Sequence, residues 1–400
     1  MAARLSSSNA PSRRCSWQLA WPPWRFVFAR SCASKRLPKG VLAMLNWHLS
    51  QDCFSDVEMR RIWSENSTLS AWIKVEQTLA NVQAQSGLIP QEAADKIATF
   101  SASHLDQDQM RDAMTMVGRP IVDLVAQMRA HIGPNLAPYA HYNSTTQDIL
   151  DTALAMQMKL SLDNITHTIE RLITQLDRHI SEQQDTQMIG RTNGQHAVPM
   201  AMTNKLQVWR SELLRREQAL QDAATRGLNV QIGGPLGDLA KYDGDTGQAV
   251  KTGVADALGL GQIDPHWQNA RDGLSDIVTA LGALCATLCK IAHNINLLSS
   301  SDIAEVSECH VTGKGASSSM HHKRNQRASE FAEAVSRLGR QRSEQIGELT
   351  LHQHERSGGV WIAEWVVVPE VFLLTSGALS WSEKMIADLT VNTEQMALSL

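Results

Sequence analysis

The sequence has 400 residues, of which 43% are apolar and 20% are charged, and its formal net charge at pH 7 is −4. A net charge this small argues against nucleic acid or an anionic membrane as a partner. No stretch approaches about 18 uncharged apolar residues, so no membrane span is predicted. The six cysteines show no metal-type pair spacing, so we predict no metal site and favour a reduced compartment such as the cytoplasm.

Residues 1–43 differ from the rest of the chain. Eight cations precede the first acid, Asp52, and serine is frequent. This composition resembles an organellar transit peptide, although the segment lacks a clear amphipathic helix. The alternative is a start codon set too early, with translation beginning at Met44. In either case we exclude the segment from the fold, and an organellar location stays open.

From Phe54 onward the pattern is helical, because apolar residues recur at a spacing of three and four. Turn signals at 87–90, 118–120 and 133–138 divide the first part into short helices. We therefore interpret residues 45–155 as a small N-terminal helical domain.

Long helical segments follow, and no segment with strand periodicity competes with them. Each would be about 35 to 50 Å long at 1.5 Å per residue, and helices of that length pack as an extended bundle. We therefore predict an all-α fold with a central bundle of about five helices over residues 156–400. The expected helices are Thr152–Ser181, Met202–Thr225, Leu274–Val306, Arg324–His352 and Ala363–Leu389.

The stretch from Gly313 to Gln326 combines small residues, three serines, a lysine and an asparagine. Successive backbone N–H groups with a cation and an amide can hold a carboxylate or an oxyanion. The stretch resembles the signature loop of the fumarase/aspartase superfamily, Gly-Ser-Ser-x-Met-Pro-x-Lys-x-Asn-Pro. The matching positions are Ser317, Ser318, Met320, Lys323 and Asn325, whereas Ala316, His321 and Gln326 depart from the pattern. On the residues alone, a solvated linker with a basic end would be the alternative.

A second polar run, from His141 to Ala153, opens the first long helix. The N–H groups at a helix N-terminus suit a carboxylate, although an ordinary N-cap run has the same composition. The run resembles the Gly-Ala-Thr-Ser-Gln-Asp-Ile-x-Asp-Thr-Ala motif of adenylosuccinate lyases and 3-carboxy-cis,cis-muconate cycloisomerases. The resemblance implies that Thr145 and Thr146 contact substrate and that His141 is a candidate proton donor.

Residues 190–199 resemble the Gly-Arg-Thr-His-Gly-Gln-His-Ala motif of the lyases, with Asn193 in place of the first His. An amide is not a general acid near neutral pH, so this change argues against adenylosuccinate lyase activity. Arg119, which follows Gly118, also argues against adenylosuccinate lyase activity. Gln195 and His196 match the motif, and the resemblance implies that they contact substrate. A buried core histidine is the alternative interpretation of His196.

The run His354–Trp365 resembles a cycloisomerase motif in which Arg356 could hold a substrate carboxylate with two hydrogen bonds. A surface arginine at a helix end is the alternative. The segments 233–237 and 267–272 match turns of the superfamily, and we expect them to be structural, with Arg271 paired with a carboxylate.

The resemblance implies a lyase or cycloisomerase nearest the 3-carboxy-cis,cis-muconate cycloisomerase branch, acting by β-elimination or its reverse on a di- or tricarboxylate without a cofactor. Ser317 would be the base, His141 the first choice of acid and His196 the second. Lys323, Asn325 and the N–H groups around Ser318 would neutralise the developing charge.

The resemblance also implies a homotetramer whose sites are shared between subunits. The chain ends at Leu400, where a further small helical domain follows in the superfamily, so we expect that domain to be missing. An adenylosuccinate lyase-like enzyme that releases fumarate and an inactive structural homologue are the alternatives.

Overall fold

We describe the fold from a computed structural model of the chain, which describes residues 47–309 and 311–400. All of these residues belong to one compact unit. The two interpretations of residues 1–43 concern a segment that lies outside the described residues.

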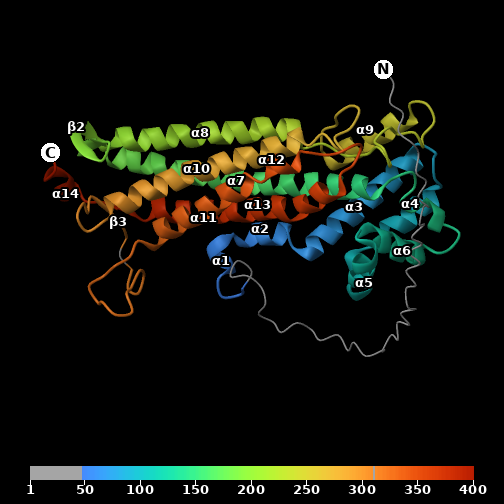
Figure 1. Ribbon diagram of the computed structural model, residues 1–400, viewed down its shortest axis with the longest axis horizontal. Helices are drawn as coiled ribbons and strands as arrows, with labels where there is room; N and C mark the ends of the chain where they lie inside the picture. Colours follow the sequence, from blue (N-terminus) through green and yellow to red (C-terminus); the bar gives the residue numbers. More distant parts are fainter. Residues whose placement is uncertain (1–46, 310) are drawn as a thin grey trace, which may run out of the picture. The chain divides into compact units, whose positions relative to one another are not determined.

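The predicted helical bundle is confirmed. Neighbouring long helices pack along their lengths, with α7 against α8 and α13, and α10 against α8, α11 and α13 (Figure 1). Their facing sides carry Leu, Ile, Val and Met, which form one continuous apolar core. Burial of this apolar surface is the main stabilising contribution to the bundle. The bounds of the five helices are α7 Thr146–Glu182, α8 Met202–Gly227, α10 Asp272–Leu298, α11 Arg327–Ser343 and α13 Gly358–Ala387.

Several helix boundaries differ from the predicted ones, among them the start of α13 at Gly358 instead of Ala363. The first long helix begins at Thr146 instead of Thr152, because the Asp148 carboxylate accepts the backbone N–H of Thr145 and caps the first turn. Helix α10 ends at Leu298, well before Val306. The single helix expected over 324–352 is divided into α11 and the short α12 (Ile346–Leu349).

The all-α class is confirmed, but the expectation of no strand is wrong at two places. Strands β1 (Gln187–Thr192) and β2 (Gln195–Ala201) form an antiparallel hairpin. Its turn residues, Asn193 and Gly194, have φ of +51° and +77°, as a type I′ turn requires, and Asn-Gly is the usual sequence for such a turn. Strands β3 (Val306–Glu308) and β4 (Leu389–Val391) form a second, shorter antiparallel pair.

Shorter helices surround a second apolar core at the end of the bundle where α7 begins (Figure 1). The two cores divide within α7, between Ala153 and Ala155. The domain boundary expected between residues 155 and 156 also lies inside this helix. Within residues 47–309 and 311–400, the other shorter helices are α1 Gln51–Phe54, α2 Val57–Ile62, α3 Glu65–Gln85, α4 Gln91–Ala98, α5 Gln107–Val117, α6 Ile121–Ile132, α9 Thr246–Leu258 and α14 Thr393–Ala397, and the 3₁₀ turns are Ala102–His104 and Ala137–Tyr139.

Helices α10 and α13 are long and apolar enough to cross a membrane by length and composition alone. However, 56% and 61% of their most apolar windows are buried inside the bundle, as expected for the core helices of a soluble protein. Both pack against several other long helices. We therefore describe them as bundle core.

The crossing of α13 with the first short helix gives a test of the packing. A Cβ atom on Gly377 would lie 2.2 Å from the carbonyl oxygen of Phe54. Because this oxygen belongs to the backbone, a side-chain rotation cannot relieve the clash. We expect Gly377→Ala to lower the free energy of unfolding by about 1 to 3 kcal/mol, measured by urea denaturation. Gly359→Ala, in the same helix with nothing within 4 Å of the added Cβ, is the control and should be neutral or slightly stabilising. Equal effects of the two changes would contradict this packing.

Candidate active site

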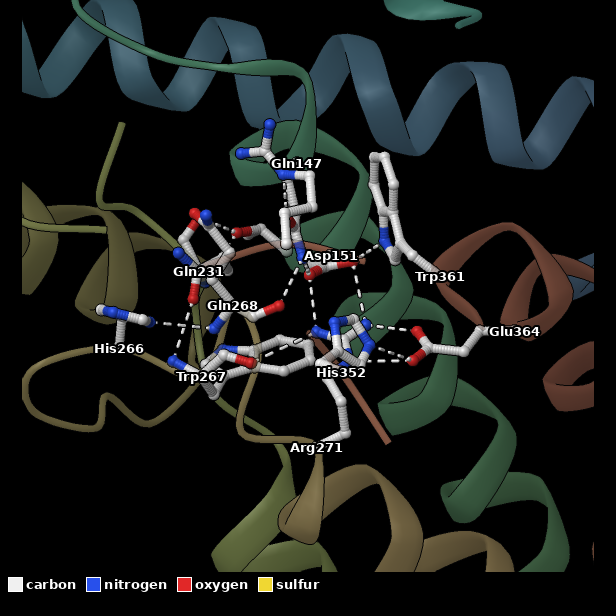
Figure 2. A network of polar contacts seen from close by, with 12 residues as sticks. Gln147, Asp151, Gln231, His266, Trp267, Gln268, Arg271, His352, Trp361 and Glu364 are labelled. Atoms are coloured by element: carbon white, nitrogen blue, oxygen red, sulfur yellow. Dashed lines mark hydrogen bonds and ion pairs between the residues drawn. The ribbon is translucent and has the colours of Figure 1, made fainter. Parts of the chain in front are cut away.

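Four segments that are distant in the sequence meet where α7 begins (Figure 2). They are the run that opens α7, the glycine turn at 231–237, the turn at 266–271 before α10, and the run at 352–364 that leads into α13. Each of the four contains a stretch that resembles the superfamily in sequence. The fold therefore brings these motifs together at one end of the bundle.

The Arg271 guanidinium lies at the centre of a buried ion-pair network (Figure 2). Its Nη1 and Nη2 atoms donate to the two Asp151 carboxylate oxygens at 2.7 and 3.2 Å, and its Nε donates to Glu364 at 3.0 Å. All three side chains are at most 2% exposed. Burial would lower the pKa of Arg271, but the two carboxylates raise it above its ordinary value. The expected pairing of Arg271 with a carboxylate is confirmed.

Asp148 holds the glycine turn against the start of α7. Its carboxylate accepts the backbone N–H groups of Thr145, Gly233 and Gly234 at 3.0, 3.0 and 2.9 Å. Burial raises the pKa of Asp148 to about 7, and the three N–H groups oppose that rise. Gly237, at the end of the turn, has φ of +82°, and a Cβ there would lie 2.4 Å from the His266 ring. The predicted structural role of this turn is confirmed.

Arg356 is anchored beside the first turn of α7. Its Nε donates to the Gln147 side-chain oxygen at 2.6 Å and its Nη2 to the Pro235 carbonyl at 3.1 Å. These two contacts hold the guanidinium beside α7, whereas the alternative interpretation was a surface arginine at a helix end. Burial lowers the pKa of Arg356, and the nearby Arg119 lowers it further.

Arg119 is a site candidate that the sequence interpretation used only to discriminate between activities. Its guanidinium lies 5.4 Å from the ring centre of Trp361, in α13, and it donates to the Gly118 carbonyl at 2.7 Å. Two guanidinium groups close to the N-terminus of α7, where Thr145 and Thr146 are half-buried, can bind a carboxylate.

His141 lies four residues before the N-cap of α7 and contacts an acid from another helix. Its Nδ1 is 2.6 Å from Oε1 of Glu76, which lies in the middle of α3 and is 2% exposed. No sequence motif includes Glu76, and the only signal was an acid within the apolar stripe of a helix. The imidazole and the two arginines give this end of the bundle groups that can bind an anion and donate a proton.

The Ser-rich loop, residues Gly313–Gln326, connects β3 to α11 at the other end of the bundle (Figure 1). Asn325 closes its base, since both its backbone N–H and its side-chain amide donate to the Gly315 carbonyl, at 2.9 and 3.0 Å. The Ser317 hydroxyl oxygen accepts the backbone N–H of Met320 at 3.1 Å. Ser318 and Lys323 are exposed at the tip.

Gln195 and His196 are exposed on β2, also at that other end (Figure 1). Because His196 is exposed, it is not the core histidine of the alternative interpretation. The neighbouring Arg191 has a structural role, since its two Nη atoms donate to the fully buried Glu305 at 2.9 and 2.6 Å.

The predicted site residues therefore form two groups that do not meet within one chain. Helix α7 has 37 residues, which corresponds to about 55 Å between the start of α7 and its other end. His141, Thr145, Thr146 and Arg356 lie at the first end, and Gln195, His196 and the Ser-rich loop lie at the second. Within the described residues of one chain, the two groups lie at opposite ends of the bundle.

A family model described as "Lyase" matches residues 55–337. The chain belongs to the lyase family of the fumarase/aspartase superfamily. Among the described residues of this lyase, no group of three or more His, Cys, Asp and Glu side chains is placed to hold a metal ion.

Curated relatives of this lyase include enzymes of two reaction types. The 3-carboxy-cis,cis-muconate cycloisomerase of Acinetobacter baylyi is 32% identical over 349 residues, which cover 86% of this chain and 77% of that protein. The N-acetyl-S-(2-succino)cysteine lyase of Dickeya dadantii is 31% identical over 358 residues, which cover 89% of this chain and 78% of that protein.

A solved structure is similar over most of the chain. The β-carboxy-cis,cis-muconate cycloisomerase of Acinetobacter calcoaceticus superposes with a TM-score of 0.81 at 29% identity, covering 88% of this chain and 79% of that one. The predicted helical fumarase/aspartase fold and the lyase or cycloisomerase class are thereby confirmed.

The buried network predicts a large stability effect. Arg271→Leu leaves the Asp151 and Glu364 carboxylates buried without their cation, so we expect a loss of about 3 to 5 kcal/mol in the free energy of unfolding at pH 7. The control is Arg226→Leu, which removes the exposed ion pair with Asp276 and should cost about 1 kcal/mol or less. Chemical denaturation measures both, and similar losses for the two variants would contradict the importance of the network.

Proposed function

We propose that this lyase catalyses β-elimination, or lactonisation as its reverse, on a substrate with two or three carboxylates, in the manner of 3-carboxy-cis,cis-muconate cycloisomerase. The observation that carries the proposal is the pairing of an anion-binding, proton-donating end with an exposed Ser-rich loop at the other end of the same helices. The similarity to cycloisomerases in sequence and in structure supports it.

In this proposal the start of α7 binds the substrate carboxylates. The N–H groups of its first turn carry partial positive charge, and Thr145 and Thr146 add hydroxyl groups. Arg356 lies beside this turn through its contact with Gln147, and Arg119 lies near it. A substrate with carboxylates on neighbouring carbons would be held with its reacting carbon between these groups.

The Ser-rich loop supplies the base and stabilises the developing charge. Ser317 removes the proton from the carbon next to a carboxylate, and that carboxylate then carries the extra electron pair as a dianion. Lys323, Asn325 and the backbone N–H groups around Ser318 neutralise it. The electron pair next expels the oxygen at the β carbon, which takes a proton from an acid. We assign the acid to His141, with His196 as the second choice.

The active form would be a homotetramer in which several copies complete each site, because one chain separates the two groups by about 55 Å. Gln195 and His196, exposed on β2, would then contact substrate bound at the start of another copy's α7. We place the enzyme in the cytoplasm, where its four described cysteines, none of which is in a disulfide, would stay reduced.

A second candidate is a lyase that splits a succinyl group from a heteroatom, favoured by the relative that acts on N-acetyl-S-(2-succino)cysteine. Adenylosuccinate is the less favoured substrate of this kind, because Asn193 replaces a histidine of the adenylosuccinate lyase motif. Release of fumarate from a succinyl substrate would place this candidate first.

The test is turnover of a panel of muconolactone-type tricarboxylates and succinyl compounds, followed by the ultraviolet absorbance of the alkene. Ser317→Ala should lower kcat by at least about 100-fold through loss of the base. Ser319→Ala, an exposed serine in the same loop, is the control and should leave kcat nearly unchanged. Wild-type activity in Ser317→Ala would refute the assigned base, and no turnover of any substrate would favour an inactive homologue.

A further inference from the structure

The backbone around His141 is held in an unusual conformation by three other elements. His141 and Asn143 have φ of +61° and +55°, in the left-handed region that few residues other than glycine adopt. Side chains fix the segment on three sides, since Arg129 donates to the Ala140 carbonyl at 3.1 Å, Gln83 to the Tyr142 carbonyl at 2.8 Å, and Asn143 to the Lys241 carbonyl at 3.0 Å. Such strain persists only where the surroundings enforce it, and it often marks a functional position.

The contact with Glu76 fixes the imidazole itself. A short 2.6 Å contact between Nδ1 and a carboxylate places the proton on Nδ1. The Glu76 side chain is 1% exposed and that of His141 is 16% exposed, so the carboxylate is enclosed while part of the ring stays accessible. Within residues 47–309 and 311–400, the other ring nitrogen, Nε2, has no hydrogen-bond partner. It is the atom left to act on a bound molecule.

Charged groups from three helices act on this ring. Burial lowers the pKa of His141, but Glu76 from α3 and Asp148 from α7 raise it, and Arg129 from α6 lowers it. The net result is a pKa above the ordinary value of a histidine. The imidazolium form is therefore available near neutral pH, and it carries a proton on both ring nitrogens.

We propose that Glu76 is a positioning residue that holds His141 as the proton donor of the reaction, with Nδ1–H bonded to Glu76 and Nε2–H directed to the substrate. This inference rests on the proposed function. When the bond between the β carbon and its oxygen breaks, that oxygen takes the Nε2 proton, while Ser317 holds the proton removed from the neighbouring carbon. His141 is then neutral and still donates Nδ1–H to Glu76. In the lactonising direction the same protons move back.

The experiment compares Glu76→Gln, Glu76→Asp and Glu65→Gln. Glu65 lies in the same helix, is exposed and has no side-chain hydrogen bond or ion pair within the described residues, so its variant is the matched control. We expect Glu76→Gln to lower kcat at least about tenfold with little change in KM, and to shift the basic limb of the kcat pH profile to lower pH. Glu76→Asp keeps the charge and should retain more activity than Glu76→Gln.

A second readout does not depend on catalysis. The ¹³Cε1 resonance of His141, assigned by its absence in His141→Asn, reports the pKa of the ring directly. We expect that pKa to lie above 6.5 in the wild type and to fall in Glu76→Gln. If Glu76→Gln does not fold, the wild-type titration and the Glu76→Asp variant still test the inference.

Three outcomes overturn the inference. They are an unshifted wild-type His141 pKa, an unchanged kcat pH profile in Glu76→Gln, or a lowered His141 pKa with unchanged kcat. Failure of the proposed function is distinguished from these, because it appears as full activity in Ser317→Ala or as no turnover by the wild type.

Discussion

The rest of the structure depends on one buried cation, Arg271, held between Asp151 and Glu364. These residues belong to α7, the turn before α10, and α13, so the ion pairs fasten three bundle helices at one end. Removing any partner would leave an uncompensated charge away from water, which is costly. The same network orders Gln147, which donates to Asp151 at 2.8 Å and accepts from Arg356 at 2.6 Å. The groups proposed to bind an anion at the start of α7 thus derive their positions from the buried ion pairs.

The length of the bundle helices then determines how a site can form. A continuous 37-residue helix separates its first turn from the β1–β2 hairpin by far more than the size of any small substrate. The Arg191–Glu305 ion pair anchors the hairpin to the bundle, and the contacts of Asn325 close the base of the Ser-rich loop. The candidate site residues that these two segments carry are mostly exposed. Polar side chains that are exposed on a backbone held in place suit a site that is completed only when copies of the chain assemble.

The bundle could be predicted from the sequence because apolar spacing over long segments has few structural alternatives. The β1–β2 hairpin was not predicted, because its stability comes from strand pairing and from the Asn193–Gly194 turn. Neither produces a regular spacing of apolar residues in the sequence. Motif matches identified Arg356 and His141, because their segments are continuous in sequence. Glu76 could not be found in this way, since its role arises from a contact across 65 positions of the sequence that only the fold creates.

The central claim is that each site combines residues from different copies, and mixing inactive variants tests it most directly. Ser317→Ala and Arg356→Leu chains change opposite ends of the bundle, so mixed oligomers should contain some sites with both native groups. We predict that activity, absent from each variant alone, returns after subunit exchange. A mixture of Ser317→Ala with Lys323→Leu, both in the Ser-rich loop, should remain inactive. If the first mixture also stays inactive although mixed oligomers form, the account of a shared site is contradicted.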